Sequence, residues 1–166
     1  MQSRAMLAYR PLTTEDAAAV ESLNEDYTAH RNEWIYHPPV EQFLSASLTE
    51  HGQTGGGWFG IMADRSLVGV VKITYETPDT VLFDYMLGAH HRGRGILTRV
   101  LRRIIADLSH KVELFKISCD KENDKAIAVP KRLGFSLEKE VPRSLKYTDR
   151  DFGDLVTYVK HNKLIN

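Results

Sequence analysis

A short glycine turn between a strand pattern and a helix pattern constrains the fold of this chain more than any other feature. Residues 80–87 form an apolar run typical of a strand, and from residue 96 to about residue 109 apolar side chains repeat on one helical face. Between them lies His-His-Arg-Gly-Arg-Gly at positions 90–95. A Gly-x-Gly turn that opens a helix leaves backbone N–H groups unpaired and directed towards one place. The pattern therefore predicts a strand, an anion-binding turn and a long helix in succession.

The turn has the chemistry of a phosphate site. The positive end of the helix dipole adds to the unpaired amides, and Arg92 and Arg94 add fixed charge beside them. The simplest interpretation is a site for a cofactor that carries a pyrophosphate. A Rossmann motif requires a third glycine where this chain has Thr98, and a P-loop requires Gly-Lys-Ser/Thr, which the sequence lacks. The alternative is an ordinary strand-to-helix turn with solvated arginines.

Length and composition favour one globular domain. The 166 residues are 42% hydrophobic and 27% charged, which is ordinary for such a domain. The 22 basic and 22 acidic residues give a formal net charge of zero, which argues against a nucleic-acid or membrane partner. The single cysteine, Cys119, excludes an internal disulfide framework and a cysteine-based zinc site. Because no apolar stretch reaches membrane-spanning length and no signal-peptide core is visible, a cytoplasmic protein is expected.

The periodicity predicts an α/β (α+β) fold in which helices cover a central, mostly antiparallel sheet. Strands are expected at residues 6–10, 58–63, 67–75, 80–87, 113–119, 135–141 and 155–161. Helices are expected at residues 11–27, 40–48, 96–109 and 123–132. Thr13 and Asp16 are expected to form a capping box on the first helix. Residues 52–57, which include four glycines, are expected to form a flexible loop, and residues 63–66 a hairpin turn.

Four segments resemble, in the same order, the GNAT superfamily of acetyl-CoA-dependent N-acetyltransferases. Within it they resemble the branch that acetylates the N-termini of ribosomal proteins, the RimJ/RimL type. The segments are Tyr-Arg-Pro-Leu-Thr-Thr-Glu-Asp-Ala at positions 9–17, the Trp34-containing stretch 31–39, Arg-Gly-Arg-Gly-Ile-Leu-Thr at 92–98, and residues 123–135, which end in Lys-Arg-Leu-Gly-Phe. The resemblance implies one domain over residues 1–166, six to seven strands with about four helices, and a V-shaped splay between the central strands.

The resemblance also implies that acetyl-CoA is the co-substrate, that no metal is needed, and which residues bind coenzyme A. The amides of residues 92–98 would hold the pyrophosphate. Backbone groups of Met86 and Leu87 would bind the pantetheine arm like an added strand, and an N–H near Leu87 would polarise the thioester carbonyl. The side chain of Asn123 would contact the cofactor arm. The complete set is Met86, Leu87, Arg92, Gly93, Arg94, Gly95, Ile96, Leu97, Thr98 and Asn123.

Asp84 is the candidate general base. It shares a strand face with Leu82 and Met86, and burial of a carboxylate on such a face would raise its pKa towards that of a base. The alternative is a salt-bridged or edge-exposed carboxylate. No general acid is identified, because the positions of the family's Tyr and Ser acids hold Pro130 and Ala126. A thiol, whose pKa is about 8.5, leaves readily without one.

The acceptor is the least constrained part of the prediction. Trp34 and Tyr36 are candidates to line its pocket, with core packing as the alternative. The resemblance favours a protein N-terminal α-amine that attacks acetyl-CoA directly in a ternary complex. A small amine, such as a polyamine, an amino-acid derivative or an amine antibiotic, is the first alternative, and a non-catalytic acyl-CoA-binding domain is the second. The resemblance further suggests a homodimer.

Overall fold

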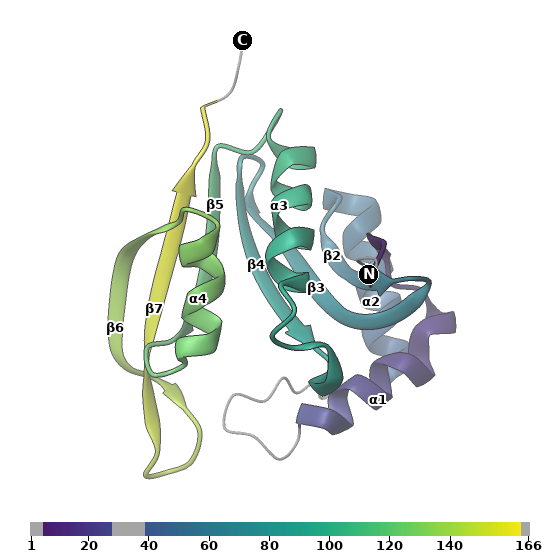
Figure 1. Cartoon of the computed structure of the whole chain (residues 1–166), viewed down its shortest axis with the longest axis horizontal. Coiled ribbons are helices and arrows are strands. Elements are labelled where there is room, and N and C mark those ends of the chain that lie inside the picture. The colour runs from purple at the N-terminus through teal and green to yellow at the C-terminus, as the bar shows by residue number, and fades with distance from the viewer. Residues whose placement is uncertain (1–4, 28–38, 164–166) are drawn as a thin grey trace, which may run out of the picture. The chain divides into compact units, whose positions relative to one another are not determined.

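The elements follow the predicted order in the computed structural model, which describes residues 5–27 and 39–163 (Figure 1). The helices are α1 (Ala17–Tyr27), α2 (Val40–Thr54), α3 (Ile96–Leu108) and α4 (Asp124–Arg132), with 3-10 turns η1 (Thr14–Asp16) and η2 (Ala89–His91). The strands are β1 (Leu7–Pro11), β2 (Gly57–Ala63), β3 (Ser66–Thr77), β4 (Thr80–Leu87), β5 (Leu114–Asp120), β6 (Ser136–Lys146) and β7 (Phe152–His161). No helix within the described ranges is long and apolar enough to cross a membrane.

The strands form one mixed sheet of seven in the hydrogen-bonded order β1-β2-β3-β4-β5-β7-β6. The pairs β1–β2, β2–β3, β5–β7 and β6–β7 are antiparallel, whereas β4 and β5 are parallel. The β4–β5 ladder runs from the pair Thr80–Leu114 to the pair Phe83–Ile117. It ends before either strand does, at the place where the resemblance implies that the central strands separate. The predicted α+β fold, with six to seven strands and about four helices, is confirmed by the seven strands and four helices of the described residues.

The chain divides into two compact units. The first unit is Met1–Thr74 with Tyr85–Val100, and the second is Tyr75–Asp84 with Leu101–Asn166. The elements β3, β4 and α3 each begin in one unit and continue in the other.

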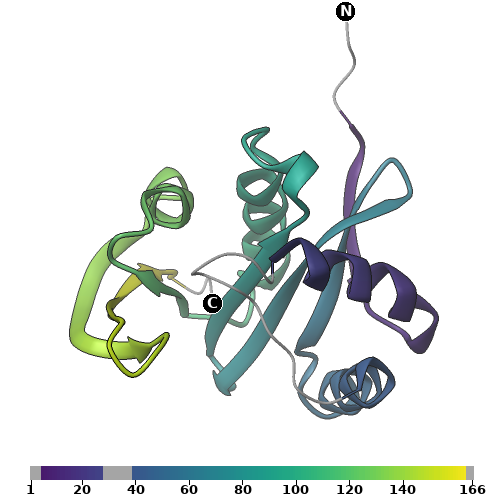
Figure 2. The same ribbon diagram turned by 90° about the horizontal axis from the view of Figure 1, so that it is seen from below.

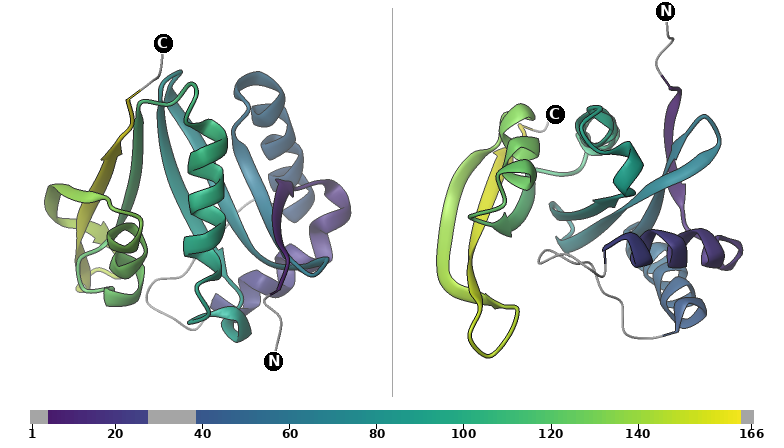
Figure 3. Two further views of the ribbon diagram at one scale, coloured as in Figure 1. Left: turned by 45° about the horizontal axis from the view of Figure 1, so that its top comes forward. Right: turned by 60° about the horizontal axis from the view of Figure 1, so that its bottom comes forward.

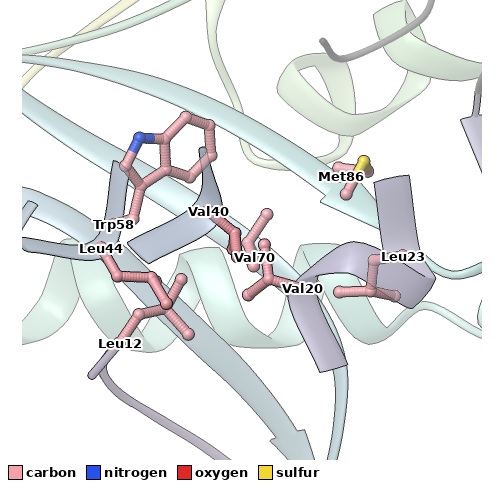
Figure 4. Packing of buried hydrophobic residues seen from close by; sticks show 8 residues of the cluster. All are labelled: Leu12, Val20, Leu23, Val40, Leu44, Trp58, Val70 and Met86. Carbon is pink, nitrogen blue, oxygen red and sulfur yellow. The ribbon is translucent and has the colours of Figure 1, made fainter. Parts of the chain in front are cut away.

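A hydrophobic core beneath two helices organises the first unit. Helices α1 and α2 contact each other and lie on the same face of β1–β3, while α3 begins on the opposite face (Figures 2 and 3). The helices and strands contribute large apolar side chains to one cluster, and Figure 4 shows eight of them: Leu12, Val20, Leu23, Val40, Leu44, Trp58, Val70 and Met86. Burying each such side chain stabilises the fold by about 1.5–3 kcal/mol. Met86 belongs to this cluster, so the end of β4 is fixed by the core.

Helix α4 and two antiparallel strand pairs make up most of the second unit. Phe83 of β4 stacks on Phe115 of β5, with 5.8 Å between ring centroids. The α4 helix packs against β5, and Lys160 of β7 donates through Nζ to the Leu133 carbonyl at 2.8 Å. This bond satisfies a carbonyl at the C-terminal end of α4. The start of α4, where Asn123 lies, is thus held on a packed helix.

Two turn predictions are confirmed. Thr13 and Asp16 form the capping box, in which the Asp16 carboxylate accepts from the Thr13 N–H at 2.8 Å. The β2–β3 turn places Asp64 and Arg65 at positive φ (47° and 74°), the conformation that two-residue hairpin loops require.

The predicted flexible loop over residues 52–57 is wrong in its first half. Helix α2 continues through Gly52 to Thr54 and ends at Gly55, which has a left-handed φ of 83°. His51 stabilises this last turn, since its ring packs edge-on against Phe59 and its Nδ1–H donates to the Gly56 carbonyl at 3.1 Å. A helical glycine costs only about 1 kcal/mol, which such contacts offset.

The β6–β7 hairpin is longer than its hydrophobic pattern indicates. Register shifts interrupt β6 between Leu137 and Lys139 and between Val141 and Leu145. Arg143 has φ of 54°, and most β6 side chains are exposed. Because each bulge shifts the alternation between faces, the period-two pattern is lost over residues 142–146.

Candidate functional site

The glycine turn forms as predicted in the first unit. Gly93 and Gly95 have φ of 76° and 74°, which is left-handed backbone that other residues adopt with strain. A Cβ at either position would meet no atom within 4 Å. Glycine is therefore required by the backbone conformation and not by crowding. The space above both residues is open to a ligand.

Buried side chains fix the first turn of α3 behind this open space. Ile96 and Thr98 are 5% and 9% exposed. The Arg99 N–H donates to the Gly95 carbonyl at 3.1 Å, which is the i→i−4 bond that starts the helix. The N–H groups of residues 96–98 precede this bond, so they have the orientation of helix N-terminal donors. A guanidinium N–H of Arg99 also donates to the Ala5 carbonyl at 3.2 Å and ties the helix to the segment before β1.

The two arginines of the turn, Arg92 and Arg94, are both exposed. Arg92 donates through Nε to the Leu87 carbonyl at 3.3 Å, so its charge is held between the end of β4 and the turn. Both charges lie beside the first turn of α3 in sequence, where its dipole also favours an anion.

Met86 and Leu87 at the end of β4 are 1% and 5% exposed as whole residues. Gly69 of β3, which the sequence analysis missed, packs against them. A Cβ at Gly69 would lie 2.7 Å from Cδ2 of Leu87 and would collide with the Met86 carbonyl. The Gly88 N–H donates to the Val68 carbonyl at 2.8 Å. Gly69 thus permits the close approach of β3 that fixes the end of β4.

Asp84 is exposed, which corrects the physical argument made for it. Its neighbours on the same face, Leu82 and Met86, are half-buried and buried. Water therefore reaches the carboxylate, and the burial that the sequence argument assumed is not found. Asp84 directly follows Phe83, the last β4 residue in the parallel ladder with β5.

Asn123 caps α4 in the second unit. Its Oδ1 accepts from the Ala126 N–H at 3.1 Å. The side-chain amide group, Nδ2, is the part that can donate to a ligand. Pro130, at the position of the family's tyrosine acid, is buried within the same helix.

A buried carboxylate at the end of β5 was not predicted. Asp120 is 5% exposed and accepts from the Tyr147 hydroxyl at 2.7 Å and from the Glu122 N–H at 2.9 Å. Tyr147 lies 27 residues from Asp120 in the chain, and Glu122 lies two residues from it. The only sequence signal is an aspartate at the end of an apolar strand pattern, which is too common to be diagnostic.

Three further candidates were a pocket lined by Trp34 and Tyr36, a metal site and Cys119. Trp34 and Tyr36 lie outside the described residues. Within residues 5–27 and 39–163 no three His, Cys, Asp or Glu side chains gather to hold a metal ion. Burial, with the neighbouring Asp120 charge, raises the pKa of Cys119 to about 11. Its thiol is therefore protonated at neutral pH and a poor nucleophile.

A family comparison decides what this arrangement is. Residues 6–136 match the family described as acetyltransferase (GNAT) domain. The chain belongs to the GNAT acetyltransferase family. The assignment of cofactor contacts to the glycine turn, the end of β4 and Asn123 stays a prediction. The predicted enzyme class, an acetyl-CoA-dependent N-acetyltransferase, is confirmed.

Individual relatives of this GNAT chain differ in their acceptors. Spermidine N(1)-acetyltransferase of Escherichia coli K12 is 28% identical over 149 residues, which are 85% of this chain and 78% of the relative. The structure of RimL, a ribosomal L7/L12 alpha-N-protein acetyltransferase in complex with coenzyme A, has a TM-score of 0.86 at 18% identity over 96% of both chains. An acetyltransferase of Salmonella typhimurium that modifies the N-terminal serine of L7/L12 has a TM-score of 0.85 at 18% identity, over 98% of this chain and 97% of the other. The likeness to RimL is confirmed at the level of the fold.

Proposed function

We propose that residues 1–166 act as one domain that transfers acetyl from acetyl-CoA to a protein N-terminal α-amine of the ribosomal-protein type. The observation that carries the proposal is the turn at Gly93 and Gly95, which faces open space in front of the first-turn amides of α3. The continuity of β3, β4 and α3 through both compact units supports a single domain. A homodimer is part of the proposal, and sedimentation velocity tests it.

The residues of the turn fit a diphosphate. Left-handed glycines, helix N-terminal amides and two arginines are the components that phosphate sites use. In this proposal the amides of residues 92–98 bind the pyrophosphate, and Arg92 and Arg94 contribute charge. Backbone groups of Met86 and Leu87 bind the pantetheine arm, and Nδ2 of Asn123 donates to it. Met86 and Leu87 are fixed by the core, Asn123 by its cap and Arg92 by a hydrogen bond, so these groups need little ordering on binding.

Acetyl-CoA supplies an activated acetyl thioester. The acceptor nitrogen forms a bond to the acetyl carbon, and the carbon–sulfur bond breaks. A backbone N–H near Leu87 would stabilise the negative charge that develops on the carbonyl oxygen. Asp84, through its contact with water, would take the proton that the amine releases. The thiolate leaves and takes a proton from solvent.

A small amine is the second candidate acceptor. The relation to spermidine N(1)-acetyltransferase favours it, because that match covers more than four fifths of the chain. The RimL-like fold favours the N-terminal α-amine. The preference for a protein terminus rests on this whole-chain likeness together with the four sequence segments.

Thiol release from acetyl-CoA separates these alternatives. The panel holds peptides with a free Ser or Ala N-terminus, the same peptides with a blocked N-terminus, and spermidine. Release with free but not blocked peptides is the expected result. Release with spermidine alone would reject the protein acceptor. Binding of acetyl-CoA without release on any amine would reject the enzyme in favour of an acyl-CoA-binding domain.

A further inference from the structure

A hydrogen-bond network in the second unit connects the β6–β7 hairpin with the turn that carries Asn123. The Tyr147 hydroxyl donates to Oδ2 of Asp120 at 2.7 Å. Gly153, at the other end of the hairpin loop, packs against the same carboxylate, since a Cβ there would lie 2.5 Å from Oδ2. The hairpin therefore encloses Asp120 from both of its ends.

The enclosed carboxylate shapes the turn after β5. Oδ1 of Asp120 accepts from the Glu122 N–H at 2.9 Å, and the Asp120 carbonyl accepts from the Asn123 N–H at 3.0 Å. The Lys121 N–H donates to the Asp154 carbonyl of β7 at 2.9 Å. Every residue of the turn is thus held by Asp120 or by the hairpin.

The turn after β5 also sets the orientation of the Asn123 side chain. Its Oδ1 is bound to the Ala126 N–H, so the direction of Nδ2 is set by the turn and by the first residues of α4. A buried carboxylate is retained in a fold only with good partners, because its desolvation is otherwise unfavourable. Asp120 meets that requirement, because Oδ2 accepts from Tyr147 of the hairpin and Oδ1 accepts from the Glu122 N–H of the turn.

We propose that Asp120 and Tyr147 are positioning residues for coenzyme A, which hold the turn so that Nδ2 of Asn123 meets the pantetheine arm. This inference rests on the proposed function. It assigns the hairpin a part in cofactor binding through Asn123, without direct contact between Tyr147 and the cofactor.

A double-mutant cycle on the full chain tests the inference. Binding of coenzyme A and of adenosine 3′,5′-bisphosphate, which lacks the pantetheine arm, is measured for the wild type, Tyr147→Phe, Asn123→Ala and the double variant. Tyr147→Phe and Asn123→Ala are each expected to weaken coenzyme A binding about threefold to fivefold, the value of one hydrogen bond. Neither is expected to change the affinity for the nucleotide. The double variant is expected to bind coenzyme A as Asn123→Ala does.

Additive losses in the double variant, or an equal loss for the nucleotide, would overturn the inference. Asp120→Asn removes the charge without changing the shape of the side chain, and it is expected to give the pattern of Tyr147→Phe. Lys146→Gln is the matched control, because Lys146 precedes Tyr147 in the hairpin but its Nζ pairs with Asp149 at 3.1 Å and not with the turn. It is expected to leave both affinities unchanged. Failure of the wild type to bind coenzyme A would instead reject the proposed function itself.

Discussion

At the scale of single residues, the exposure of Asp84 changes how a base can work in this protein. A buried carboxylate would act through an elevated pKa, whereas an exposed one acts through its position and through water. Asp84 directly follows the last pair of the β4–β5 ladder, and its carboxylate is exposed to water. In the proposed reaction it removes a proton from the amine as the bond forms.

Replacing this carboxylate separates chemistry from binding. Asp84→Asn is expected to lower kcat by about 100-fold or more, the range of general-base effects, without a change in acetyl-CoA affinity. Stability is expected to change by less than about 0.5 kcal/mol, as for exposed positions. Steady-state kinetics measure kcat, and a thermal melt measures the change in stability. Glu76→Gln, which breaks the ion pair with Lys116 in the same unit, is the control, and unchanged activity in Asp84→Asn would remove the assignment.

At the scale of elements, two glycines with different backbone conformations, one left-handed and one helical, give a matched pair of tests. Gly95 has a left-handed φ, whereas Gly52 lies in the exposed part of α2, and neither is crowded. Gly95→Ala is expected to destabilise by about 1–2 kcal/mol and to weaken acetyl-CoA binding about tenfold, because the turn must change shape. Gly52→Ala is expected to stabilise by about 1 kcal/mol and to leave binding unchanged. Equal effects of the two on affinity would contradict a phosphate-binding turn.

The capping box of η1 gives the fold a dependence on acid pH. The hydrogen bond from Arg10, with help from the Thr13 N–H, lowers the pKa of the Asp16 carboxyl against the opposite effect of burial. Since the folded pKa lies below the unfolded value of about 3.9, its contribution is complete above that value and is lost as the pH falls through the folded pKa. Urea unfolding between pH 7 and pH 3 is expected to show a decline below about pH 4 that is smaller in Asp16→Asn. The same decline in both proteins would show that other carboxyls cause it.

The elements that the sequence predicts correctly are those with local signals. The periodicity of α3, the Gly-x-Gly turn and the Thr13 cap each depend on residues within a few positions of one another. The extended β6 was missed because its bulges break the alternation. The pair of Asp120 and Tyr147 was missed because it depends on tertiary contact between a strand end and a hairpin. Gly69 was missed for the same reason, since nothing local indicates that a strand end packs against it.

At the scale of the whole molecule, the proposed binding residues are distributed over both compact units. Met86, Leu87 and residues 92–98 belong to the first unit, and Asn123 to the second. A ligand that binds the folded state and not the unfolded chain stabilises the fold against unfolding. The strands β3 and β4 and the helix α3 run through both units, which favours a single cooperative transition.

Thermal unfolding with and without acetyl-CoA tests this coupling. At 100 times its dissociation constant, the ligand is expected to stabilise the folded chain by about 2.7 kcal/mol, which raises Tm by about 5–10 °C for a chain of this size. Far-UV circular dichroism and tryptophan fluorescence are expected to report the same shift, since a two-state transition moves every probe together. At the same ligand concentration, acetyl-CoA is expected to raise the Tm of Gly95→Ala less than that of the wild type, because the variant binds it more weakly. The Tm of Gly52→Ala is expected to rise as much as that of the wild type. Two separate transitions, of which acetyl-CoA moves only one, would contradict the proposal that residues 1–166 act as a single domain.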